Sequence, residues 1–147
     1  MPQGDVAPLN AIFVAGNPVI REYEVKTATG VYPGTFVIRD TSDGNIQVAG
    51  QAAADVLGVT DVEPNELRTT IYDAGDQVRV LSKCVVLVNA CSGGTITAGQ
   101  TVMSASGGTV IAGTTAGLTV GRALNSVANP SSTSGWRTAS WVIVELW

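Results

Sequence analysis

The groups in this chain that could carry out chemistry are two cysteines and twelve carboxylates, because its 147 residues include no histidine. Histidine is the commonest general base and the commonest metal ligand. A Ser-His-Asp or Cys-His triad cannot be built, and a zinc site has two candidate ligands where four are needed. Paired carboxylates could hydrolyse a substrate, but no Asp or Glu pair has a recognisable setting. We therefore predict a protein that is not an enzyme and uses no cofactor or metal.

The two cysteines, Cys84 and Cys91, are seven positions apart. On one continuous strand they would face opposite sides, about 23 Å from each other at roughly 3.3 Å per residue. That separation excludes a mutual disulfide unless the chain reverses between them. Two buried thiols in a reducing compartment is the preferred interpretation.

Two further segments resemble ligand sites in composition. Residues 40–45 (DTSDGN) could hold a calcium ion, but they lack the bidentate Glu that ends such a loop, so a turn is favoured. Residues 113–117 (GTTAG) lack the lysine of a phosphate-binding loop. Six of the twelve carboxylates lie between Asp55 and Asp76. A solvated acidic edge is favoured there over a loose cation site.

Charge excludes one class of partner. The net charge is −4, and the eight Lys and Arg residues form no cluster, so binding to nucleic acid is not expected. Charged residues make up 14% of the chain, against about 25% in an average protein. A weakly charged surface suits a chain that is partly buried against copies of itself or against a protein partner.

The elements that must position these groups are short strands. Val- and Thr-rich pieces alternate with Gly and Asn turns, and residues 85–88 are apolar on both faces, which is typical of a central strand. Helix propensity rises only at residues 51–55, enough for one turn at most. Residues 73–76 predict a tight hairpin turn between strands at 69–72 and 77–81. The fold class is all-β: a small β-barrel or β-sandwich of short antiparallel strands.

Residues 34–59 resemble residues 99–123 in the order of their Gly-initiated strands, at an offset of 63–65 positions. Two related β units would explain this similarity, and so would chance among Gly, Val and Thr pieces. Residues 1–20 carry three prolines and predict an extended N-terminal arm, with residues 21–147 as a single β domain. No secretory signal is visible, and the longest apolar run is too short to cross a membrane.

Tryptophan marks a possible contact surface. In the terminal strand at 140–147, alternation places Trp141, Ile143, Glu145 and Trp147 on the face opposite Val142, Val144 and Leu146. Either both faces are buried within the subunit, or the aromatic face, together with Trp136 in the preceding loop, meets another chain. We prefer the second interpretation.

Six segments taken in order carry a resemblance to a known family: GTFV at 34–37, VLGVT at 56–60, DAGDQVRV at 73–80, TITAGQTV at 95–102, AGLTVGRAL at 116–124 and WVIVEL at 141–146. Together they resemble the small capsid decoration (cement, or head-stabilising) proteins of tailed bacterial viruses. The resemblance spans roughly residues 30–146. Gly-Val-Thr at 58–60 departs from the commoner Gly-Val-Ala, and the Trp-bearing C-terminal end has no counterpart.

The resemblance implies a structural virion protein that is made in the host cytoplasm and lies on the capsid exterior. It implies a β-barrel or β-sandwich subunit, often a homotrimer, that bridges major capsid proteins and stabilises the icosahedral shell. The family's terminal arm would correspond to residues 1 to about 18. Combined with the tryptophans, the expected partner-binding residues are Pro2, Val6, Pro8, Leu9, Ile12, Phe13, Trp136, Trp141 and Trp147.

Two other functions stay open. A β-sandwich binding module for carbohydrate or a cell-surface ligand could use Trp136 and Trp141 to stack on sugars. A hydrolase without histidine could use carboxylates such as Asp73 and Asp76. The first would show a glycan-array signal that depends on Trp136, and the second an activity that depends on the two carboxylates.

Overall fold

The computed structural model describes residues 12–26, 30–40, 44–63, 71–91, 93–128, 130 and 141–147. Within these residues the regular elements are strands apart from one short 3-10 turn, so the prediction of an all-β fold is confirmed. The strands are β1 (Phe13–Ala15), β2 (Val19–Glu24), β3 (Phe36–Arg39), β4 (Ile46–Val48), β5 (Val56–Thr60), β6 (Gln77–Ser82), β7 (Val85–Asn89), β8 (Thr101–Ser104), β9 (Val110–Ala112), β10 (Gly121–Ala123) and β11 (Trp141–Leu146); the 3-10 turn is η1 (Ser106–Gly108).

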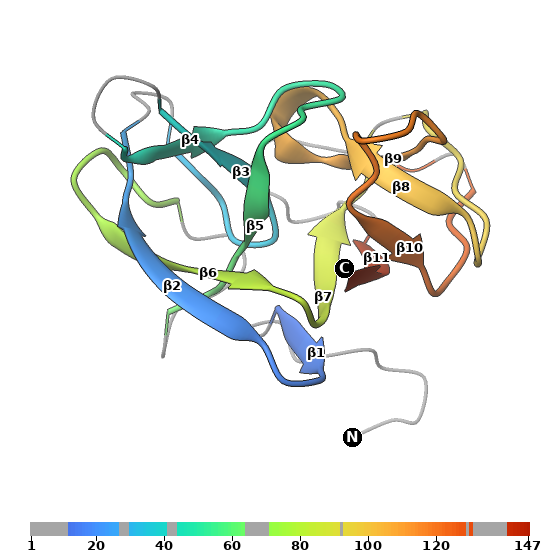
Figure 1. The fold of residues 1–147 in the computed structure, drawn as a ribbon, viewed down its shortest axis with the longest axis horizontal. Coiled ribbons are helices and arrows are strands. Elements are labelled where there is room, and N and C mark those ends of the chain that lie inside the picture. The colour runs from blue at the N-terminus through green and yellow to red at the C-terminus, as the bar shows by residue number, and fades with distance from the viewer. Residues whose placement is uncertain are drawn as a thin grey trace.

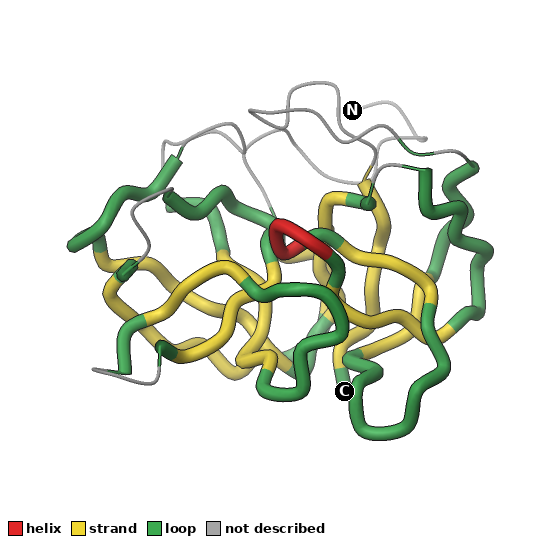
Figure 2. The backbone as a smooth tube through the Cα atoms, turned by 90° about the horizontal axis from the view of Figure 1, so that it is seen from above, coloured by secondary structure: helices red, strands yellow, loops and turns green. Residues whose placement is uncertain are grey.

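The strands form two sheets that lie beside each other along the long axis of the molecule (Figure 1). One sheet has the order β2-β6-β5-β3-β4, and the other has the order β1-β7-β11-β10-β8-β9. Neighbouring strands within both sheets are antiparallel. Figure 2 shows strands on both sides of η1, which lies near the middle of the view.

The two sheets repeat one arrangement. If β1 is set aside, strands β7–β11 have the same order across the second sheet as strands β2–β6 have across the first. Equivalent parallel bridges, Val25↔Ile46 and Ala90↔Val110, join the end of the first strand of each set to its third strand along the chain. These bridges bend each sheet toward a small barrel. The internal similarity in the sequence therefore reflects two related β units, called below the first unit (residues 19–82) and the second unit (residues 85–146).

A pair of glycines shows how closely the units correspond. A Cβ atom at Gly58 would lie 2.2 Å from the carbonyl oxygen of Leu81, and one at Gly121 would lie 2.3 Å from that of Glu145. Contact distances this short leave no room for any other residue. Gly58 is the third residue from the end of β5, and Gly121 is the third residue from the end of β10. Glycine at this position thus permits the same close approach between β5 and β6 and between β10 and β11.

The two units share one hydrophobic core. Buried side chains of both units meet in it, among them Phe36, Val59 and Leu81 from the first unit and Val86 and Val144 from the second. The first unit also has a smaller core of its own, made by Val25, Val31, Val37, Ile46, Tyr72, Val78 and Val80. Burial of apolar surface at about 25 cal/mol per Å² is the main term that holds such a protein together.

Part of the segment predicted as an arm, residues 1–20, pairs with the sheets, because β1 pairs with β7 and β2 pairs with β6 along its whole length. Residues 1–11 of that segment lie outside the described residues. Residues 51–55 form a turn and no helix.

The predicted hairpin at residues 73–76 is wrong in its partners. The turn itself is present, with Gly75 at φ +93°. Tyr72, however, pairs with Val31, and β6 pairs with β2 and β5. The buried position of Tyr72 in the core of the first unit explains the change, because tertiary packing overrides a local turn signal.

Candidate interaction surfaces

Four of the nine predicted partner-binding residues lie within the described part of the chain. Pro2, Val6, Pro8, Leu9 and Trp136 lie outside it. Of the four, Phe13 and Trp147 are exposed, Trp141 is half-buried, and Ile12 is fully buried. The structure therefore divides the set into side chains that pack within the subunit and side chains that face outward.

Ile12 and Trp141 pack within the subunit. Ile12 is 0% exposed, and its carbonyl oxygen accepts a hydrogen bond of 2.9 Å from the backbone N–H of Leu87. Gly34 lies against both side chains, since a Cβ there would be 2.5 Å from Cζ3 of Trp141 and 3.2 Å from Cδ1 of Ile12. Ile12, which was predicted as a contact residue, has its side chain in the core of the subunit. Trp141 also packs against that core.

Trp147 is exposed to 54%, and Arg122 of β10 lies over its ring with the guanidinium carbon 5.9 Å from the ring centre. This cation–π pair is worth about 0.5–1 kcal/mol at an exposed site. The ring lines a shallow groove between the two units, together with Leu57, Leu118 and Leu146. Alternation along β11 holds as predicted, since Val142, Val144 and Leu146 are buried on the other face.

Three exposed apolar side chains lie near the turn from β1 into β2. Phe13, Val19 and Ile20 are exposed to 38%, 37% and 51%, and they fall within eight residues of each other. Figure 1 shows the turn that joins β1 to the start of β2 at the lower edge of the view, below β7. We call these three side chains the β1–β2 corner. Val19 and Ile20 follow each other in β2 and therefore face opposite sides of the strand.

Sequence reasoning identified Phe13 but missed Val19 and Ile20. The signal was present, because this apolar pair directly precedes a segment at 21–24 in which charged residues predominate. An apolar pair at the start of such a strand has no core of its own to enter, so exposure could have been expected.

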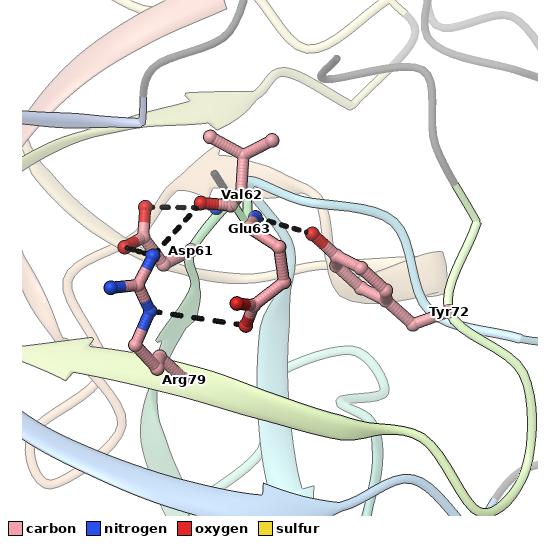
Figure 3. A network of polar contacts seen from close by, with 5 residues as sticks. All are labelled: Asp61, Val62, Glu63, Tyr72 and Arg79. Carbon is pink, nitrogen blue, oxygen red and sulfur yellow. Dashed lines mark hydrogen bonds and ion pairs between the residues drawn. The ribbon is translucent and has the colours of Figure 1, made fainter. Parts of the chain in front are cut away.

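In its described residues, the acidic stretch between Asp55 and Asp76 contains a network of ion pairs and hydrogen bonds. Arg79 on β6 forms an ion pair with Asp61 at 3.1 Å and donates to the Val62 carbonyl oxygen at 3.1 Å (Figure 3). Its Nε lies 3.8 Å from a carboxylate oxygen of Glu63. The backbone N–H of Glu63 donates to the Tyr72 hydroxyl at 2.8 Å. The network holds the segment after β5 against β6.

Burial raises the pKa of the Asp61 carboxyl, and it outweighs the hydrogen bond from Val62 N–H and the charge of Arg79, which lower it. The folded state therefore binds the proton more tightly than the unfolded state. This contribution to stability is complete at pH below the unfolded pKa of 3.8 and is lost as pH rises through the folded pKa.

We expect the free energy of unfolding of wild type to fall relative to that of Asp61→Asn as pH rises from about 3 to 7. The reason is that Asn cannot ionise, while its side-chain oxygen can still accept the Val62 N–H. Urea unfolding at a series of pH values measures the difference. Parallel pH profiles for the two proteins would contradict the prediction.

Neither cysteine forms a disulfide, and of the two thiols predicted to be buried, Cys84 is buried and Cys91 is half-buried. Burial, with a smaller effect from the charge of Asp61, raises the pKa of the Cys84 thiol to about 11. At neutral pH this thiol is almost entirely protonated and therefore a poor nucleophile.

No group of three or more Cys, Asp or Glu side chains in the described residues is arranged to hold a metal ion. Of the segment at 40–45, for which a turn was favoured over a calcium site, residues 41–43 lie outside the described residues. Among the described elements there is no helix long and apolar enough to cross a membrane.

Comparison with known families decides the identity of the chain. The profile of the XM1 gp53 minor capsid protein family matches residues 1–143. The chain belongs to this phage minor capsid protein family. It is thus a structural protein of a phage virion, as the resemblance to capsid-associated proteins led us to expect.

The fold is similar to one solved phage structure. The N base of the head fiber protein gp8.5 of bacteriophage phi29 superposes with a TM-score of 0.57 at 14% sequence identity, over 88% of this chain and 95% of that chain. At this identity the similarity shows a common fold. No curated protein matches the sequence of this minor capsid protein.

Proposed function

We propose that this minor capsid protein decorates the outer face of the capsid shell, bridges neighbouring major capsid proteins and stabilises the shell, with a homotrimer as the bound form. Membership of a minor capsid protein family supports association with the capsid. The low content of charged residues, 14%, supports a surface that is largely covered in the assembly.

The observation that carries the proposal is the β1–β2 corner. It exposes Phe13, Val19 and Ile20 next to the point where residues 1–11 join the β domain. We propose that Pro2, Val6, Pro8 and Leu9 extend the contact made by this corner. An arm that becomes ordered on a partner adds contact area at a cost in entropy. Many symmetry-related copies then raise the avidity without strong single contacts.

Shells of the cognate phage that lack this protein provide the test. We expect the purified protein to co-sediment with them and to raise the temperature at which they release DNA or disassemble. Shells with and without the protein that resist heat equally would contradict the stabilising role.

Replacing Phe13 and Ile20 together by Ser should weaken binding to these shells by about tenfold or more, because central apolar contacts dominate protein interfaces. Leu124→Ser is the matched control, since Leu124 is 46% exposed and lies on the second unit. Equal affinity of the double variant and the control would contradict the use of the β1–β2 corner.

A binding site for carbohydrate is the second candidate, and the exposed Trp147 ring with Arg122 above it favours this site over Trp141. Aromatic faces stack on sugars. A glycan-array signal that Trp147→Ala abolishes would support this function, and a signal that only Trp136→Ala abolishes would move it to the preceding loop.

A further inference from the structure

Strand β2 is an edge strand for half of its length. It pairs with β6 on one side, from Val19↔Ser82 to Glu24↔Gln77. On its other side, the parallel bridge Val25↔Ile46 brings β4 against the residues that follow it. Within the described residues no strand lies beside residues 20–22 on that outer side.

Hydrogen bonding at the end of β2 shows which of its backbone groups face outward. The N–H of Val25 donates to Asp76 on the β6 side, and the N–H of Lys26 donates to Ile46 on the opposite side. Backbone groups of successive residues in a strand point alternately to its two neighbours. Ile20 and Glu22 lie an even number of positions before Lys26, so their N–H and C=O groups point to the same side as those of Lys26, away from β6.

The second unit shows what such an edge accepts. Its first strand, β7, is bridged at its end by Ala90↔Val110, the counterpart of Val25↔Ile46 at an offset of 64–65 residues. The first half of β7 is covered by β1, and the N–H of Leu87 donates to the carbonyl oxygen of Ile12 at 2.9 Å. At the same offset, Leu87 corresponds to Glu22. Among the described residues, no strand of the first unit takes the position that β1 fills on the second.

A second copy of β2 is a poor occupant of this edge. Two-fold pairing centred on Glu22 or on Arg21 places like charges directly opposite each other, which is destabilising. Pairing centred on Ile20 places Pro18 opposite Glu22, and proline has no N–H to donate. The edge therefore favours a strand of different sequence.

We propose that the outer edge of β2 at residues 20–22 binds an extended strand of the major capsid protein, in the place that β1 occupies on β7. This inference rests on the proposed shell-binding function. Ile20 belongs both to this edge and to the β1–β2 corner, so the added strand lies beside the apolar contact surface. The Arg21 and Glu22 side chains select a strand with charges opposite to theirs, and main-chain hydrogen bonds supply the affinity.

Glu22→Pro tests the edge, with Glu22→Ala as its control. Proline removes the outward N–H and places its ring in the path of an added strand, whereas alanine keeps the N–H. Pairing with β6 does not use this N–H, so both variants should fold, as circular dichroism would show. In co-sedimentation with shells that lack the protein, we expect Glu22→Pro to bind about tenfold or more weakly than Glu22→Ala.

Hydrogen exchange of the wild-type protein gives a measurement that needs no variant. The amides of Ile20 and Glu22 should exchange more slowly on the shell than in free protein, while the amide of Val25 changes little. Equal affinity of the two variants, or unchanged exchange at Ile20 and Glu22, would overturn the inference while leaving shell binding intact. Slow exchange of these two amides in free, self-associated protein would assign the edge to a second copy and equally overturn it. Failure of wild type to bind shells would instead reject the proposed function.

Discussion

Phe36→Ala is expected to lower the free energy of unfolding by about 3–5 kcal/mol, the usual cost of truncating a buried phenylalanine. Phe36 is 0% exposed and lies in the core that joins the two units. Its strand β3 is the central member of the first unit's β4-β3-β5 set, so backbone on both sides limits collapse into the cavity. Urea unfolding followed by tryptophan fluorescence would measure the change.

Phe13→Ala is the matched control, because Phe13 is the other of the chain's two phenylalanines and is 38% exposed. We expect it to change stability by less than about 1 kcal/mol, as surface substitutions usually do. The two variants together separate core packing from surface contact. A loss at Phe36 no larger than the loss at Phe13 would contradict a core shared between the units.

Gly108→Ala is expected to destabilise the protein by about 2–4 kcal/mol, through backbone strain and overpacking together. Gly108 has φ +73°, and a Cβ there would lie 2.2 Å from Cγ2 of Thr35 and 2.7 Å from the carbonyl oxygen of Phe36. Its N–H also donates to Ala49 at 2.9 Å. Gly108 of the second unit thus packs directly against the first unit, and Figure 2 shows its 3-10 turn near the middle of the molecule.

Its neighbour supplies the control. Gly107 has φ +72°, nearly the same conformation, but no atom lies within 4 Å of the position that its Cβ would take. Gly107→Ala should therefore cost about 1 kcal/mol, which is the strain of a left-handed alanine alone. Chemical unfolding of both variants measures the difference between them, which reports on contact between the units. Equal destabilisation would show that this contact is not tight.

The duplicated architecture gives the two units different exposed edges. The same order of five strands occurs twice, but β1 covers the first half of β7 and no described strand covers the equivalent part of β2. Open strand edges are aggregation hazards that proteins usually block. An edge left open beside exposed apolar side chains in a minor capsid protein is therefore a place to look for the contact with the shell.

The linear order of residues was enough to predict the all-β class, the terminal strand and the capsid-associated family. Alternation in Trp141–Leu146 assigned Val142, Val144 and Leu146 to the buried face, and all three are buried. The similarity of residues 34–59 to residues 99–123 was compatible both with two related units and with chance, and the repeated strand order showed that two units are present. These features are local or periodic, so they can be read from neighbouring residues alone.

Tertiary structure alone decided which strands pair and which apolar side chains stay exposed. The turn at residues 73–76 was recognisable, but not the pairing of Tyr72 with Val31, because a strand's partner can lie anywhere in the chain. Alternation likewise gives the face of Trp141 but not whether Gly34 or a second protein covers it. Exposure at Val19 and Ile20 follows from the position of β2 at the edge of its sheet, which depends on contacts with residues some 60 positions away.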